Sequence, residues 1–320
     1  MDSKLLQASE INIAIAAQNL LKGNLVAFPT ETVYGLGANA TNKNAIDRIY
    51  EVKSRPKDHP LIVHISNISK VNLWVKEIPN YALDLATNFW PGPMTLILKR
   101  SEIAKDFVTG GQDTIGLRIP KNTIALNLLA HFENIGGLGI AAPSANRFGA
   151  VSPTSALHVL QELEDTLNGS DIVLEGGDCE IGIESTIIDC TSESPRILRP
   201  GAVTLESINS VVDSKISIIE PKNKIKHSGI FDSHYSPKAK VLLNLVPQPG
   251  DGFIAMIGIE TPMGVHRIST PINIEDFATK IYASLRSADE LKLSRVVVIT
   301  PPDIGIGIAI NDRLRKAAEK

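Results

Sequence analysis

The chain has 320 residues, enough for about two domains at a typical size of roughly 150 residues each. Its composition, 43% hydrophobic and 21% charged, is that of an ordinary soluble protein and shows no bias toward disorder. The formal net charge of −3 excludes a global positive field that would attract nucleic acid or a membrane surface. Any site for an anion must therefore be a local cluster of side chains.

The cysteine pattern and the N-terminal segment predict a cytoplasmic protein without a membrane segment. Cys179 and Cys190 show neither a CxxC spacing nor further partners, which argues against a disulfide framework or a zinc site and fits a reducing cytosol. The N-terminal segment carries Asp2 and Glu10 within its apolar residues, so we interpret it as an amphipathic helix ending at Gly23 rather than as a signal peptide. No apolar run approaches the ~20 residues that span a bilayer.

Short apolar, β-branched runs alternate with helical patterns in the first part of the chain, which indicates an α/β or α+β sheet domain over 1–212. The pattern after Ser152 predicts a helix with Ser152 as its N-cap and Pro153 at its first position. The expected strands are 25–28, 61–65, 95–99, 114–119, 139–142, 172–174, 186–190 and 196–198. The expected helices that lie between them are near 43–53, 80–89, 122–132, 154–167 and 204–213.

A change of composition separates this domain from a smaller one. The stretch 219–238 is rich in Pro, Lys, Ser and Gly, and we interpret 213–238 as a linker. The remaining 239–320 shows two strands, a helix, a strand and a helix, which favours a small Rossmann-like layer. No GxGxxG follows its first strand, so dinucleotide binding is not predicted.

The first polar cluster is the run PTETVYGLG, which follows the strand 25–28. It places Thr30, Glu31, Thr32 and Tyr34 at one strand end. For each residue alone, a loop whose hydroxyls cap backbone groups is the simpler explanation. Together they suggest a binding site, because ligands of such sheets bind at the carboxyl ends of the strands.

The second cluster follows a predicted helix. Lys53, Arg55 and Lys57 crowd around its end, and Pro56 prevents its continuation. Cations at a helix C-terminus complement the helix dipole, which is the simpler explanation for each of them. His64 lies inside the next strand, where a packed, hydrogen-bonded histidine is more common than a ligand.

Further along the chain, Arg118 lies inside an otherwise apolar strand, and arginine is rarely buried without a partner. Two alternatives stay open: Arg118 pairs with an internal carboxylate, or it faces a polar cavity and binds an anion. After the strand 139–142 come Ser144 and Asn146, and Ser152 starts a predicted helix, whose N-terminus is a ready anion site. A polar turn and a helix cap would produce the same pattern.

Near the end of the domain, Ser185 precedes one strand and Arg199 follows another. The chain contains no GxSxG, HExxH or P-loop motif, and no nucleophile stands out. Instead, positively charged side chains and hydroxyl groups recur at the ends of the expected strands. This set of side chains suits the binding of anionic substrates, with catalysis by proximity and charge stabilisation.

These motifs occur in an order that resembles a known family. The strings are FPTETVYGLGANA, KSR before PLIVHI, WPGPMTLILK, APSAN with SPT, ESTIID and LRPG, all within about residues 9–212. With them the chain resembles the threonylcarbamoyl-AMP synthases of the YrdC-like fold. SGIFDSHYSP at 228–237 and GIGIAINDRLRKAA near the C-terminus resemble the linker and second domain of the longer members.

The resemblance implies a YrdC-like twisted mixed sheet with helices and a central cavity over 1–212, a linker or lid over the active site at 213–238, and a smaller Rossmann-like C-terminal domain over 239–320. It also implies a nucleotidyltransferase that makes L-threonylcarbamoyladenylate and diphosphate from L-threonine, bicarbonate or CO2, and ATP. The product would serve the threonylcarbamoyladenosine modification of tRNA, passed on to downstream tRNA threonylcarbamoyl-transfer proteins. Mg2+ would arrive with ATP, without a dedicated protein site. Whether the chain contacts tRNA itself is left open.

The resemblance also assigns roles to individual residues. Arg118 would bind the threonine carboxylate. The residues implied in catalysis are Lys53, Arg55, Ser144 and Asn146. Those implied on the ATP side are Lys53, Arg55, Thr114, Ser144, Ser152, Arg199 and Tyr235, and those on the threonine side are Thr30, His64, Arg118, Ala141 and Ser185.

Two alternatives compete with this assignment. An RNA-binding module without chemistry would need exposed aromatic rings, yet only 5% of the residues are aromatic and the net charge is negative. A hydrogenase-maturation carbamoyltransferase contains a similar domain, but it carries cysteine-rich zinc motifs that two isolated cysteines cannot supply. Threonine-dependent consumption of ATP would distinguish the synthase from the RNA-binding module.

Overall fold

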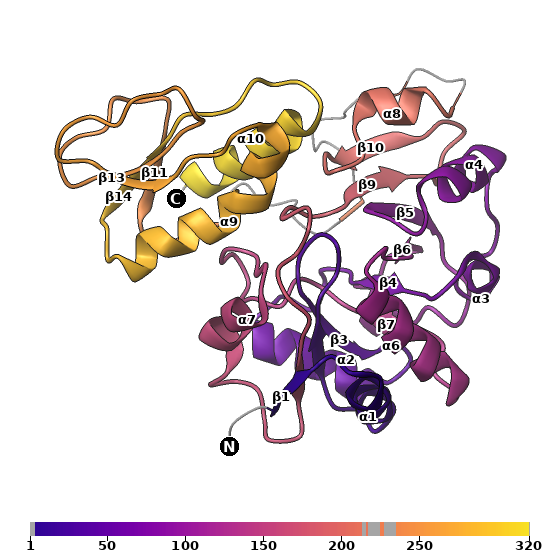
Figure 1. The fold of residues 1–320 in the computed structure, drawn as a ribbon. Helices are drawn as coiled ribbons and strands as arrows, with labels where there is room; N and C mark the ends of the chain where they lie inside the picture. The colour runs from indigo at the N-terminus through magenta and orange to yellow at the C-terminus, as the bar shows by residue number, and fades with distance from the viewer. Residues whose placement is uncertain (1–3, 213–215, 217–224, 227–234, 320) are drawn as a thin grey trace.

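A computed structural model describes residues 4–212, 216, 225–226 and 235–319 (Figure 1). Most of the linker predicted over 213–238, including His234, therefore lies outside the described residues. The described strands form two sheets, a mixed one and a smaller parallel one. No described helix is both long enough and apolar enough to cross a membrane.

The larger sheet has ten strands in the described part of the chain, in the order β1-β8-β2-β3-β7-β4-β6-β5-β9-β10. The sheet contains both parallel pairs, such as β4 with β6, and antiparallel pairs, such as β5 with β6. The strands are β1 (Lys4–Gln7), β2 (Val26–Phe28), β3 (Gly35–Asn39), β4 (Ile62–His64), β5 (Met94–Lys99), β6 (Thr114–Arg118), β7 (Ile140–Ala141), β8 (Ile172–Glu175), β9 (Thr186–Asp189) and β10 (Arg196–Arg199).

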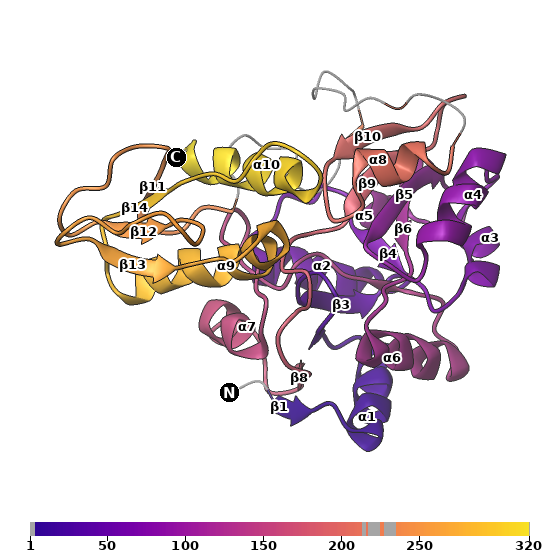
Figure 2. The ribbon, with the colours of Figure 1, turned by 45° about the horizontal axis from the view of Figure 1, so that its top comes forward.

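Helices cover both faces of this sheet (Figures 1 and 2). Side chains alternate along each strand, so β2 presents Val26 and Phe28 to one face and Ala27 to the other. The first face packs against α1 and α6, and the second against α2. The helical elements are α1 (Glu10–Leu21), α2 (Lys43–Lys53), the short η1 (Ile68–Lys70), α3 (Val71–Trp74), α4 (Asn80–Phe89), α5 (Asp106–Thr109), α6 (Thr123–Asn134), α7 (Ala156–Leu163) and α8 (Leu205–Asn209).

The structure corrects the predicted helix start at Ser152. Ser155, not Ser152, is the N-cap of α7: its backbone is extended and its side chain accepts a hydrogen bond from the His158 amide at 3.3 Å. The Ser152 hydroxyl instead donates to the Glu184 carboxylate at 2.6 Å. The expected anion site at a helix N-terminus formed by Ser152 is therefore wrong.

The run after PTETVY is also a strand, β3, where the simpler explanation of the sequence was a loop leading to a helix. β2 and β3 form an antiparallel pair, and residues 29–34 connect them. Gly37 in β3 is required by packing, because a Cβ atom there would lie 2.8 Å from both Ile140 Cγ2 and Phe28 Cε1. The glycines of GLGAN therefore permit close contact inside the sheet.

The smaller sheet belongs to the C-terminal part of the chain, and its order is β11-β14-β12-β13. The β13 strand was not predicted. Figure 1 shows α9 and α10 on the side of this sheet that faces the larger one. The elements are β11 (Lys240–Leu243), β12 (Gly252–Ile254), β13 (His266–Ser269), α9 (Ile274–Glu290), β14 (Arg295–Val298) and α10 (Ile306–Ala318).

One apolar cluster joins the two parts. Val33 and Ile183 of the larger part are buried with Phe277 and Ile281 of α9. Burial of apolar surface contributes about 25 cal/mol per Å², so this cluster stabilises the contact between the two parts.

Candidate active site

A cavity of about 560 Å³, including its open mouth, lies among the loops at the ends of several strands of the larger sheet. Residues that are far apart in the sequence meet there. The lining residues are Thr30, Thr32, Val33, Gly35, Arg55, Ile62, His64, Arg118, Ala142, Pro143, Ser144, Glu184, Ser185, Arg199 and Tyr235.

Arg118, at the end of β6, pairs with an internal carboxylate, which was the first alternative that the sequence left open, and it also faces the cavity. It is buried, and its Nη2 lies 2.8 Å from the Glu31 carboxylate, so it pairs with an internal carboxylate. The same Nη2 donates to Thr32 Oγ1 at 2.9 Å. Arg118 also lines the cavity, and its Nε has no hydrogen-bond partner among the described residues. The guanidinium can therefore offer a further N–H to an anion.

The loop between β2 and β3 is organised by Thr30. Its hydroxyl donates to the Val33 carbonyl at 2.7 Å, and it accepts from the amides of Thr32 and Val33. These local bonds fix a tight turn that holds Thr30 and Thr32 at the cavity and leaves Glu31 beside Arg118.

His64, at the end of β4, is the buried neighbour of Arg118 in the sheet register. Burial, together with the positive charge of Arg118, lowers the pKa of His64 to about 3. The imidazole is therefore neutral at physiological pH. Its Nδ1 has no hydrogen-bond partner among the described residues.

Lys53 and Arg55 leave the end of α2 in different directions. Ser54 caps the helix in the left-handed conformation, with φ of 51°. Lys53 is buried away from the cavity lining, and its ammonium donates to the carbonyls of Ser144, at 2.6 Å, and of Asn146. Burial, and secondarily Arg55, hold the pKa of Lys53 well below its ordinary value.

Arg55 itself lines the cavity. Its Nη2 donates to the Pro60 carbonyl at 3.1 Å, and its guanidinium lies 5.9 Å from the ring centre of Phe148. Burial lowers the pKa of Arg55 to about 10, so the side chain stays charged at neutral pH.

The loop after β7 contributes Ser144 but not the other residues expected there. Ser144 lines the cavity and forms an isolated antiparallel β-bridge with Gly35. Asn146 is buried outside the lining, and its amide donates to the carbonyls of Arg147 and Ala150. Ala141 is paired within the sheet, while its neighbour Ala142 reaches the cavity.

The remaining wall comes from the segments around β9 and β10. Arg199 lines the cavity and donates through Nη2 to the Ser185 carbonyl at 2.9 Å and to its hydroxyl at 3.2 Å. The Ser185 hydroxyl also contacts Thr95 Oγ1 at 2.8 Å. Burial would raise the pKa of Glu184, but Arg313 and Arg199, with the Ser152 hydroxyl, lower it to about 2. Glu184 is therefore an anion in the wall.

Thr114 lies in a neighbouring cavity rather than in the first. That cavity is mainly apolar, shares Ile62 with the first, and contains Thr95, which contacts Ser185. Its lining residues are Pro60, Leu61, Ile62, Thr95, Ile97, Gln112, Thr114, Gly116, Ile187 and Lys226.

The structure thus brings together most of the predicted site residues and separates the rest. Those that line the first cavity are Thr30, Arg55, His64, Arg118, Ser144, Ser185, Arg199 and Tyr235. Those outside its lining are Lys53, Thr114, Ala141, Asn146 and Ser152.

Thr32 and Glu184 also line the cavity. Thr32 belongs to the polar cluster PTETVYGLG that suggested a binding site, but the resemblance assigned a role to neither residue. In the described part of the chain, no cluster of three or more His, Cys, Asp or Glu side chains is arranged to hold a metal ion.

Comparison with known families agrees with this architecture. The family model Sua5–YciO–YrdC, described as "Telomere recombination", matches residues 18–201. The chain belongs to the Sua5–YciO–YrdC family. A second model, described as "Threonylcarbamoyl-AMP synthase, C-terminal domain", matches residues 203–319. Both matches confirm the resemblance predicted from the motifs.

Relatives within the Sua5–YciO–YrdC family are similar over nearly the whole chain. Threonylcarbamoyl-AMP synthase of Pyrococcus abyssi is 39% identical, over 97% of this chain and 94% of the relative. Threonylcarbamoyl-AMP synthase of Bacillus subtilis is 38% identical, over 98% and 94% respectively. The crystal structure of P. abyssi Sua5 complexed with L-threonine has a TM-score of 0.86 and 36% identity, over 99% of this chain and 97% of that one.

Proposed function

We propose that the cavity binds L-threonine, CO2 or bicarbonate, and the phosphates of ATP, and that the chain joins them into threonylcarbamoyl-AMP with release of pyrophosphate. The observation that carries this proposal is that Arg55, Arg118 and Arg199 line one cavity together with several hydroxyl groups. Synthesis of threonylcarbamoyl-AMP is the activity named for relatives that match nearly the full length of the chain.

The charges of the cavity suit the meeting of two anions. Two unit negative charges 4 Å apart repel each other by about 4 kcal/mol at an effective dielectric constant of about 20, which would slow a reaction on the order of a thousandfold. Fixed guanidinium groups offset this repulsion without reorganising during the reaction. A cavity lined by three of them can therefore hold a carbamate next to a phosphate.

On the threonine side, Arg118 is the proposed partner of the amino acid carboxylate, because its Nε faces no protein acceptor among the described residues. The P. abyssi Sua5 structure with L-threonine supports threonine as the amino acid. A neutral His64 adds no positive charge that would repel the threonine ammonium group. Thr30 and Ser185 offer hydroxyl groups on the same side.

On the nucleotide side, Arg55, Arg199, Ser144 and Tyr235 are the proposed contacts of the phosphates. The adenosine would extend toward the neighbouring cavity that contains Thr114. We assign Lys53 an indirect role, because its ammonium fixes the carbonyls of the loop that carries Ser144.

In the proposed reaction, the protein aligns the substrates and supplies positive charge. The threonine ammonium loses a proton, and the amine nitrogen forms a bond to the carbon of CO2 as one C=O π bond opens onto oxygen. The nitrogen then releases a second proton to solvent, which gives a carbamate. A carbamate oxygen then forms a bond to the α-phosphorus of ATP, and the bond to the pyrophosphate oxygen breaks. Mg2+ travelling with the triphosphate would supply further charge compensation when bound. Downstream, the adenylate would be consumed in the threonylcarbamoyl modification of tRNA.

The test is pyrophosphate release by the purified full chain with ATP and Mg2+. We expect release only when both threonine and bicarbonate are present, and threonylcarbamoyl-AMP as the nucleotide product. Release that is independent of threonine, or that persists in buffer freed of CO2, would refute the proposal.

A further inference from the structure

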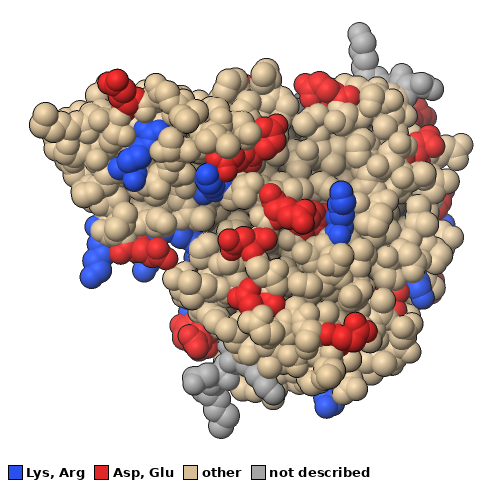
Figure 3. Space-filling model, viewed as in Figure 1, with Lys and Arg blue, Asp and Glu red and all other residues tan. Residues whose placement is uncertain are grey.

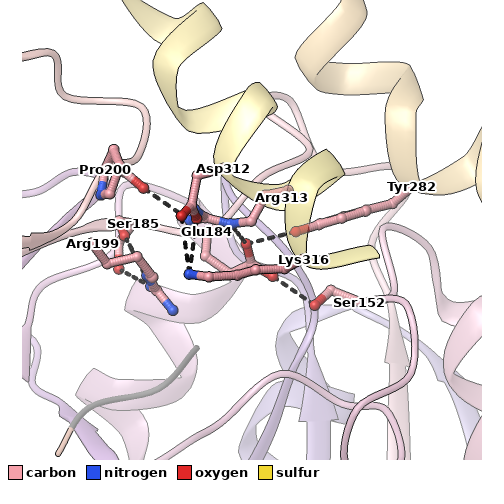
Figure 4. A network of polar contacts seen from close by, with 9 residues as sticks. All are labelled: Ser152, Glu184, Ser185, Arg199, Pro200, Tyr282, Asp312, Arg313 and Lys316. Carbon is pink, nitrogen blue, oxygen red and sulfur yellow. Dashed lines mark hydrogen bonds and ion pairs between the residues drawn. The ribbon is translucent and has the colours of Figure 1, made fainter. Parts of the chain in front are cut away.

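A network of polar contacts joins the C-terminal helices to the wall of the cavity (Figure 4). At its centre is Glu184, whose Oε1 accepts from the Ser152 hydroxyl at 2.6 Å. Its Oε2 accepts from the Tyr282 hydroxyl of α9 at 2.8 Å and from Arg313 Nε of α10 at 2.9 Å. A carboxylate of the larger part is thus held by two side chains of the smaller part.

Arg313 has further partners that make its position specific. Its side chain is 1% exposed, and its Nη1 contacts Asp312 at 2.5 Å. Its Nη2 donates to the Pro200 carbonyl at 3.0 Å, directly after Arg199, which lines the cavity. The fork of Arg313 therefore contacts the wall at two points, one just before β9 and one just after β10 in the chain.

The same two helices hold the ring of Tyr235. The rings of Tyr235 and Tyr282 are stacked, with centroids 5.7 Å apart and planes at 21°. The Arg313 guanidinium lies 5.3 Å from the centroid of the Tyr235 ring. Tyr235 has φ of 62°, a conformation that a non-glycine residue adopts at some cost and keeps only where its surroundings hold it.

The negative charge of Glu184 would affect the binding of ATP if it were not neutralised. Glu184 lines the cavity in which the phosphates of ATP are proposed to lie. A carboxylate there that lacked a counter-charge would repel them. Among the described residues, Arg313 is the only cation paired directly with Glu184, and it comes from the other part of the molecule.

We propose that Arg313, with Tyr282, is a positioning residue for the reaction: from the C-terminal part it neutralises Glu184 and holds Tyr235 at the nucleotide side of the cavity. This inference rests on the proposed function. It gives the C-terminal part a role in nucleotide binding, beyond that of packing against the larger sheet.

The experiment compares full-length variants in the pyrophosphate assay and in calorimetric titration with a non-hydrolysable ATP analogue. Arg313→Gln removes the cation that is paired directly with Glu184 and should raise both the KM for ATP and the Kd of the analogue by about tenfold or more. The KM for threonine should change by less than about twofold, because the threonine side is not contacted. Arg315→Ala, on an exposed residue of the same helix, is the matched control and should behave as wild type.

A double variant distinguishes neutralisation of the Glu184 charge by Arg313 from a purely structural role of Arg313 in packing the helices. Glu184→Gln removes the charge that Arg313 balances, so adding it to Arg313→Gln should recover most of the lost nucleotide affinity. A structural role alone would lower the thermal midpoint in every variant, with no recovery and no difference between the two substrates. Equal changes in both KM values, or no recovery in the double variant, would overturn the inference.

Tyr282→Phe provides a second route if Arg313→Gln does not fold. It removes one hydrogen bond to Glu184 and keeps the ring that stacks on Tyr235. We expect a rise of about threefold to tenfold in the KM for ATP, and an unchanged value would overturn the inference. Wild-type chain that binds the ATP analogue but releases no pyrophosphate would refute the proposed function and leave the Arg313 comparison measurable by titration.

Discussion

At the scale of single residues, Arg118 is the proposed partner of the threonine carboxylate. Its guanidinium is buried, paired with Glu31 and hydrogen-bonded to Thr32, so its orientation is fixed before substrate arrives. A lysine would retain the charge but lose the planar fork that recognises a carboxylate.

Arg118→Lys should therefore raise the KM for threonine by about tenfold to a hundredfold, while the KM for ATP stays nearly constant. Arg48→Lys is the matched control, because Arg48 also pairs with a buried carboxylate, Asp171, at 2.6 Å but does not line the cavity. We expect the control to reduce stability without changing either KM. Equal effects of the two substitutions on the KM for threonine would remove Arg118 from the site.

The neutral state of His64 gives a second prediction at this scale. Burial and the charge of Arg118 lower its pKa from an ordinary value of 6.5 to about 3. The imidazole should thus show no titration by NMR between pH 8 and pH 5, the range in which an unperturbed histidine changes its charge. A titration midpoint near pH 6.5 would show that His64 is solvated and not packed beside Arg118.

Single site residues could be predicted from the sequence where the residue type was unusual for its position. A charged Arg118 within an apolar strand was a strong signal, and the structure places it in the cavity. Ser152 was misassigned because a helix N-cap and a hydroxyl that bonds a distant carboxylate look the same in a local sequence. Thr114 and Ala141 were assigned by family resemblance, and the structure places both outside the first cavity.

At the scale of elements, α9 depends on a close approach to the loop before Glu184. Gly182 has φ of 83°, and a Cβ atom there would lie 2.5 Å from Thr279 Cα and 2.6 Å from the Ala278 carbonyl. Both contacts are with the backbone of α9, which cannot rotate away as a side chain can. The glycine therefore sets the distance between the helix and the cavity wall.

Gly182→Ala should displace α9, reduce stability by about 1–3 kcal/mol or more, and weaken ATP binding through Tyr282. Gly177→Ala is the matched control, since Gly177 has a similar φ of 80° but open space around the new Cβ atom. The control measures the backbone strain alone. Urea denaturation of both variants provides the comparison, and equal losses of stability would show that the contact with α9 is unimportant.

Most elements were predictable from periodicity, and the exceptions have physical causes. The helices α2 and α4 were predicted with the bounds that the structure shows, 43–53 and 80–89. β3 was missed because its glycines weaken the strand signal, although close packing of Gly37 is what requires them. β13 was missed because its short sequence does not show a strand pattern. Its pairing with β12 makes it a strand.

At the scale of the whole molecule, the two parts meet through an apolar cluster and a buried charge network, and sequence reasoning could not find the network. Tyr282 and Arg313 lie 98 and 129 positions from Glu184 in the chain, and no local pattern connects them. On the face shown in Figure 3, Lys and Arg are dispersed among Asp and Glu and do not form a continuous basic surface for RNA.

The network predicts how stability depends on acid. The native pKa of Glu184 is lowered from 4.5 to about 2 by Arg313 and Arg199, despite burial. Its contribution, on the order of 3 kcal/mol, is complete above about pH 4.5 and is lost as the pH falls toward 2. Glu184→Gln should thus flatten the decline of unfolding free energy over this range in urea titrations. A decline as steep as in wild type would show that Glu184 is not held as an anion.

We propose that one cavity brings the amino acid and the nucleotide together. A crystal structure of the full chain with L-threonine and a non-hydrolysable ATP analogue tests it most directly. We expect the threonine carboxylate on Arg118 and the α-phosphate beside Arg55 or Arg199 within the same cavity. Ligands in separate cavities, or a threonine carboxylate away from Arg118, would contradict it.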